Sequence, residues 1–140
     1  MPFANHAFVL AVDPTTGASF ATCGGPGSGR GTVPGAKSRQ LVGLSAPRGT
    51  ASFPDALSDV NFYQVAGTID LPIDEFAGRM NDFAQATNNN DLSYTASTNS
   101  NSYVFTFVQS LGFERPTPAF GLWAPGSSNG VPAFGAQCRR

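Results

Sequence analysis

The 140-residue chain is long enough for one domain with its own core, and its 12 phenylalanines predict an aromatic core. Its formal net charge is −1, with 12% charged residues and a single lysine, Lys37. Because nucleic-acid binding needs clustered Lys and Arg side chains, this composition argues against a nucleic-acid partner. Every apolar run is shorter than the roughly 20 residues that span a bilayer, so no transmembrane segment is expected.

The first half of the chain has the composition of β-strands. Apolar runs at 3–12 and 18–23 stand on either side of the turn sequence Asp13-Pro14-Thr15-Thr16-Gly17, so they predict a β-hairpin. A glycine-rich segment at 24–35 follows and is expected to be a loop. Two further segments have strand composition, at 40–44 and 60–71.

The pattern becomes helical after residue 72. Apolar side chains then recur at helical spacing, at Ile73, Phe76, Met80 and Phe83. Asp74 and Glu75 fall in the first turn, where the helix dipole favours negative charge. This helix is expected to end near the polar run 87–91. A second helix is expected over 101–111, with Gly112 as its stop.

Strands that precede helices predict an α+β fold, a small antiparallel sheet with helices packed on it, in a single domain over 1–140. The glycine segment matches neither the P-loop nor the dinucleotide pattern, so no nucleotide cofactor is expected. One histidine and no closely spaced cysteine pair give no metal site. Cys23 and Cys138 are either a disulfide pair or two unpaired thiols, and both alternatives stay open.

Four polar residues, Asn-Ser-Asn-Ser at 99–102, stand at the beginning of the second helix. Ser and Asn are good N-caps, but a cap needs only one such residue. A nucleophile at a helix N-terminus gains from the dipole, and a serine nucleophile needs a base within reach. His6 is the one histidine in the sequence, and its simpler interpretation is a partly buried side chain with one hydrogen bond. We therefore expect Ser100 and His6 to form a nucleophile–base pair, with plain helix capping as the alternative.

Residues 99–104, which open a helix ending at Leu111-Gly112, resemble the nucleophile motif of NlpC/P60-type and related papain-like enzymes. In that motif an Asp or Asn precedes a Cys, followed by two small or polar residues, an aromatic and an aliphatic. The early strand that carries His6 resembles the permuted branch of this superfamily, in which the histidine strand comes first. With Tyr94 and the later Ala124-Pro125-Gly126, the chain also resembles papain-like toxin domains at the ends of bacterial secretion effectors.

The resemblance implies a papain-like, permuted NlpC/P60-type catalytic domain over the whole chain. Ser100 matches the nucleophile, Asn99 and Asn101 flank it, and His6 matches the base. The family's usual nucleophile is Cys. The serine is therefore an engineered Cys-to-Ser change that silences a toxic enzyme, the mark of a natural serine branch, or the sign of a domain that has lost catalysis, and all three stay open.

The other site positions have weaker matches to the family. Thr22 or Cys23, on the second strand, is expected to face the base as the orienting residue, and Tyr94 is expected near the oxyanion. The glycine segment at 24–35 and the proline-rich tail are expected to shape the substrate cleft, because binding residues concentrate on loops.

By resemblance, the activity is that of a hydrolase or acyltransferase, an amidase or peptidase type of enzyme acting on an amide or ester bond. An antibacterial toxin that cleaves peptidoglycan peptides is the family-typical case, and it would have a cognate immunity protein. Such a chain is secreted or delivered by a specialised secretion system, since no classical signal peptide is evident, or it is cytoplasmic. The alternative is a catalytically inactive papain-like binding or structural module.

Overall fold

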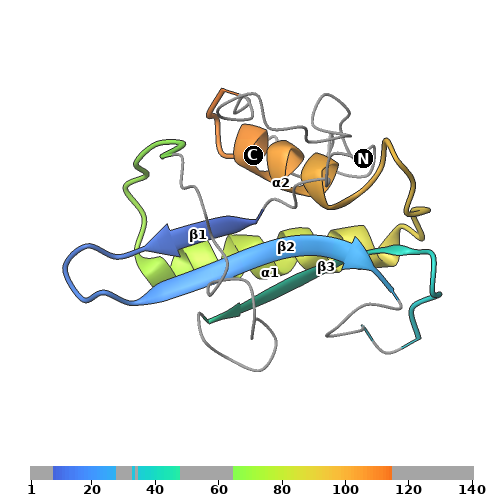
Figure 1. The fold of residues 1–140 in the computed structure, drawn as a ribbon. Coiled ribbons are helices and arrows are strands. Elements are labelled where there is room, and N and C mark those ends of the chain that lie inside the picture. The colour runs from blue at the N-terminus through green and yellow to red at the C-terminus, as the bar shows by residue number, and fades with distance from the viewer. Residues whose placement is uncertain (1–7, 28–32, 34, 48–64, 115–140) are drawn as a thin grey trace, which may run out of the picture.

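The computed structural model describes residues 8–27, 33, 35–47 and 65–114. It contains three strands and two helices: β1 (Val9–Val12), β2 (Ser19–Pro26), β3 (Leu41–Pro47), α1 (Ile73–Asn89) and α2 (Ser100–Ser110). The strands form an antiparallel sheet in the order β1-β2-β3. In the fold of Figure 1, α1 packs against β3 and β2, and α2 packs against β2. The predicted α+β class, with helices packed on a small antiparallel sheet, is confirmed.

The turn sequence joins β1 and β2 as a hairpin, as predicted. The Asp13 carboxylate accepts a hydrogen bond from the Thr15 amide at 2.8 Å, and the Asp13 amide donates to the Ala18 carbonyl at 2.9 Å. Gly17 adopts φ +73°, a left-handed conformation that glycine tolerates best. A short side chain that bonds the backbone ahead of it, followed by a glycine, therefore fixes the register of the hairpin.

Strand β2 is longer than predicted, because Gly24 and Gly25 belong to it rather than to a loop. Gly24 pairs with Gly43 of β3, and the side chain of Tyr103 from α2 lies over both. A Cβ atom on either glycine would come within 3 Å of a Tyr103 atom. These glycines mark a close approach of a helix to the sheet, which is a recognised role of glycine inside strands.

The outer edge of β3 is covered by groups from the second half of the chain. The Asn88 side chain, near the end of α1, accepts from the Gly43 amide at 2.7 Å and donates to the Gly43 carbonyl at 3.1 Å. Just before β3, Gln40 forms a bridge with Ser93. Part of the polar run 87–91 is therefore used inside the fold, where Asn88 satisfies backbone groups of an edge strand.

The strand predicted at 60–71 is wrong for its described part, since residues 65–71 form no strand, and residues 60–64 lie outside the described residues. Val65 is 86% exposed, and Gly67 lies so close to the Phe113 ring that a Cβ atom there would collide with it. The apolar composition that suggested a strand has no ladder partner among the described strands. Both predicted helices are confirmed, with boundaries within two residues of the predicted ones.

Side chains of both helices meet the sheet in an aromatic core, as the phenylalanine content predicted. The Phe83 ring packs edge-on against Tyr103 and Phe107, with centroids 4.8 and 4.9 Å apart. Ala11 and Leu41 contribute to this core from the sheet. Within the described ranges, neither helix is long and apolar enough to cross a bilayer.

Candidate functional site

The polar residues at the start of α2 form a reciprocal cap. The Asn99 side-chain oxygen accepts from the amides of Asn101 at 3.0 Å and Ser102 at 3.4 Å. In return, the Ser102 hydroxyl accepts from the Asn99 amide at 2.7 Å and donates to the Asn99 carbonyl at 2.9 Å. This is a capping box with Ser in place of the usual Glu or Gln at its third position. The cap accounts for Asn99 and Ser102 without any catalytic role.

Ser100 is the first residue of α2 and is 3% exposed. It shares a helix face with Tyr103, Val104 and Phe107, three, four and seven positions on, which belong to the core shared with the sheet. The first turn of α2 contains no acidic residue. The positive end of the helix dipole at Ser100 is therefore buried and is not offset by a carboxylate from its own first turn.

Three amides near the start of α2 already donate hydrogen bonds, two of them to the cap and one to the first backbone bond of the helix. Those of Asn101 and Ser102 donate to the Asn99 side chain, and that of Tyr103 donates to the Asn99 carbonyl at 3.0 Å. Free amides at the N-terminus of a helix can bind an oxyanion. In the structure, these three amides have protein acceptors already, so charge stabilisation at Ser100 has to come mainly from the dipole or from side-chain donors.

Thr22 lies at the centre of a buried hydroxyl network. Its oxygen lies 2.7 Å from the Tyr103 hydroxyl, 2.9 Å from the Ser45 hydroxyl and 2.8 Å from the Leu44 carbonyl. Ser45 also reaches the Met80 carbonyl at 3.0 Å. Three hydroxyl protons thus serve four contacts, so at most three are hydrogen bonds at one time. Thr22 is fully buried and joins β2, β3, α1 and α2 through these contacts.

Cys23 follows Thr22 in β2 and therefore faces the other side of the sheet. It packs with Ala21 and Ala46, away from the core that receives α2. Burial raises the pKa of the Cys23 thiol from its ordinary 9.0 to about 11, so the thiol is neutral at physiological pH. Cys23 is a free thiol within the described part of the chain, and Cys138, its possible disulfide partner, lies outside the described residues. Of the two predicted orienting residues, Thr22 alone shares the face on which α2 packs.

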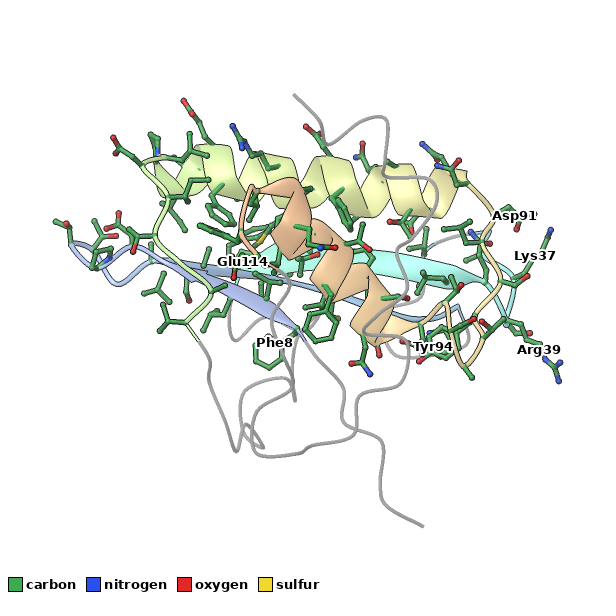
Figure 2. The ribbon with its side chains drawn as sticks, turned by 90° about the horizontal axis from the view of Figure 1, so that it is seen from above. Phe8, Lys37, Arg39, Asp91, Tyr94 and Glu114 are labelled. Atoms are coloured by element: carbon green, nitrogen blue, oxygen red, sulfur yellow. The ribbon has the colours of Figure 1, made fainter. Side chains whose placement is uncertain are left out.

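Tyr94 belongs to the segment that connects α1 to α2 in the sequence, and its side chain is half-buried. Its amide donates to the Arg39 carbonyl at 2.6 Å, and its ring packs against the core. Figure 2 shows it near Arg39, toward the end of the molecule at which α2 begins. The structure thus brings Tyr94 to the same end as Ser100.

His6, the predicted base, lies outside the described residues. It stands three positions before Val9 in the sequence, so the chain lets it lie up to about 10 Å from Val9. Val9 pairs with Thr22, whose hydroxyl contacts Tyr103, one turn beyond Ser100. Val9 packs against the helix-side core, whereas Phe8 packs on the other side of the sheet. The predicted contact between His6 and Ser100 involves a residue outside the described ranges, so it stays a prediction.

Sequence reasoning missed Tyr103 and Ser45, the partners of Thr22. Tyr103 lies in an apolar helical run, and nothing near it in the sequence indicates a partner for its hydroxyl. Ser45 lies in a short strand, and its neighbour on the adjacent strand depends on the register of the sheet. The paired glycines at 24 and 43 were the available signal, because they indicate that a bulky side chain comes close to the sheet.

Comparisons with family models, with curated proteins and with solved structures find no match to this chain. The likeness to papain-like enzymes therefore rests on the motif around Ser100 and on the order of the elements. Within the described part of the chain, no group of three or more His, Cys, Asp or Glu side chains is placed to hold a metal ion.

Proposed function

We propose that this protein is a hydrolase or acyltransferase that attacks an amide or ester carbonyl through Ser100. The observation that carries the proposal is the position of Ser100, at the first residue of a buried helix and on its core-facing side. The dipole there favours a developing anion, and its effect is larger in a water-poor environment than at the surface.

In the proposed reaction, the Ser100 hydroxyl attacks the carbonyl carbon while His6 takes its proton. The tetrahedral intermediate then collapses, and His6 returns the proton to the leaving amine or alcohol. The resulting acyl-enzyme passes its acyl group to water in a hydrolase or to another nucleophile in a transferase. The helix dipole and the Tyr94 hydroxyl are the proposed sources of stabilisation for the oxyanion, because three amides near the start of α2 already donate within the fold.

The proposed substrate class is peptide, with peptidoglycan peptides as the case that the resemblance favours. A protein amide or a lipid ester uses the same acyl chemistry. An antibacterial effector of this kind would be secreted and would require a cognate immunity protein in the producing cell. These features follow from the resemblance to papain-like toxin domains.

The second candidate function is an inactive papain-like binding or structural module. The capping box favours it, because hydrogen bonds within the fold already explain two of the four polar residues at 99–102. In that case Ser100 is kept as a small residue that fits the buried start of α2.

A serine-directed fluorophosphonate probe separates the two functions. The hydrolase is expected to be labelled at Ser100, to lose labelling in Ser100→Ala, and to be labelled at least tenfold more slowly in His6→Gln, since general bases contribute about 10²–10⁴-fold. Ser97→Ala, an exposed serine just before the helix, is the matched control and should be labelled normally. Absence of labelling at Ser100, together with unchanged cellular effects in Ser100→Ala, would establish the inactive module instead.

A further inference from the structure

The side-chain amide of Asn99 is used at both ends. Its oxygen accepts from the first turn of α2, while its nitrogen donates to the Ala96 carbonyl at 2.8 Å. Asn99 is 6% exposed; its bond to the Asn101 amide is buried, and its bond to the exposed Ala96 is partly buried. This one planar group therefore connects Ala96, which lies before the helix, to the first turn of α2. Ser100 is the residue that directly follows Asn99.

The segment on the other side of this tie is itself an ordered turn. The Thr95 amide donates to the Thr98 carbonyl at 2.8 Å, and the Thr95 hydroxyl accepts from the Thr98 amide at 3.0 Å. Asn99 thus connects two hydrogen-bonded units. The direction in which α2 starts is set by the turn as well as by the helix.

A helix cap alone does not require an amide. Ser, Thr and Asp cap about as well as Asn, because only the acceptor oxygen is needed. The nitrogen of Asn99 does something else. An ionised Asp has no donor, and Ser or Thr would have to accept from the first turn and donate to the Ala96 carbonyl through one oxygen atom, whereas Asn99 uses two separate atoms. Asp would also place a negative charge beside the residue that is proposed to develop one.

We propose that Asn99 is a positioning residue, whose two-ended amide fixes residue 100 against the helix dipole and keeps that position free of negative charge. This inference rests on the proposed function of Ser100, and it gives Asn99 a role other than contact with the substrate. It requires an amide at position 99 rather than any good N-cap.

The test uses Ser100→Cys as a reporter, because a thiol at a helix N-terminus has a pKa that depends on the dipole. Thiolate ultraviolet absorbance is followed against pH, with the Ser100 protein subtracted to remove Cys23 and Cys138. Asn99→Ser, which keeps the cap oxygen and neutral charge, is expected to raise the midpoint by about half a pH unit or more. Asn99→Asp is expected to raise it further, because charge repulsion is added.

Asn88→Ser is the matched control, since Asn88 is another two-ended amide whose hydrogen bonds go to Gly43 of β3. It should lower stability to a similar extent and leave the thiol midpoint unchanged. If Asn99→Ser keeps the midpoint of the Ser100→Cys parent, then any N-cap suffices and the inference is wrong. Asn99→Thr also places a neutral N-cap at this position, and its thiol midpoint tests the inference in the same way if Asn99→Ser does not fold.

The titration needs neither His6 nor turnover, so its outcome is distinct from that of the probe experiment. Absence of probe labelling in the unsubstituted protein would overturn the proposed function, whatever the thiol midpoint. With labelling present, Asn99→Ser is expected to slow it at least threefold while Asn88→Ser does not. Equal labelling rates in the two variants would overturn the positioning role alone.

Discussion

The two helices of this protein begin in opposite ways. α1 begins after the exposed Pro72, has no side-chain cap, and places Asp74 and Glu75 in its first turn. α2 begins with a buried, neutral capping box and has no acidic residue in that turn. Since α1 forms without a cap, capping is no general requirement for helices in this chain. Polar residues are needed at 99–102 because the start of α2 is buried, and water cannot satisfy the amides of its first turn there.

The first prediction concerns the fourth residue of each helix, Tyr103 in α2 and Phe76 in α1. Tyr103 is fully buried against Gly24 and Gly43, whereas Phe76 lies nearer the surface. Tyr103→Ala is expected to cost about 3–5 kcal/mol of unfolding free energy, with Phe76→Ala toward the lower end of that range. Urea denaturation measures both.

Tyr103→Phe is the control that keeps the ring and removes the hydroxyl from the Thr22 network. It should cost about 1 kcal/mol, the net value of a typical buried hydrogen bond. If Phe76→Ala lost more unfolding free energy than Tyr103→Ala, the side chain at the start of α2 would not be the more tightly packed of the two.

The second prediction compares the two caps directly. Asn99→Ala removes an acceptor for two amides and a donor to the Ala96 carbonyl, so the expected cost is about 1–2 kcal/mol. Pro72→Ala removes no side-chain hydrogen bond and is expected to change stability by less than about 0.5 kcal/mol. Equal effects in urea denaturation would remove the distinction between a buried, capped start and an exposed one.

Several elements could be predicted because their signals are local. The hairpin follows from an Asp-Pro-Thr-Thr-Gly turn, and α1 follows from apolar residues at helical spacing. The helix at 101–111 was also foreseen from its apolar face and its Gly112 stop, and Gly112 does adopt φ +89°. Each of these signals lies within a few residues of the structure that it determines.

The features that could not be predicted depend on distant partners. Whether Gly24 belongs to a loop or to a strand depends on Tyr103, almost eighty positions later in the chain. The segment 65–71 has strand composition but packs Gly67 against Phe113 instead of joining the sheet. Which of Thr22 and Cys23 faces α2 depends on strand parity. These are tertiary choices that override local propensity.

The last prediction concerns the charges at the start of α1, where the effect is smallest. Asp74 and Glu75 are exposed, so their attraction to the dipole is worth about 0.3–1 kcal/mol each at low ionic strength. The double variant Asp74→Asn/Glu75→Gln should therefore lose stability in dilute buffer, and most of the loss should vanish at about 1 M salt, where the screening length is only about 3 Å. The cost of Asn99→Ala should persist at the same salt concentration, because its hydrogen bonds join uncharged groups. Denaturation midpoints at two salt concentrations measure this difference. If the double variant lost the same stability at both salt concentrations, the two carboxylates would be acting through hydrogen bonds to the first turn and not through the dipole. The two helix starts would then differ in burial alone.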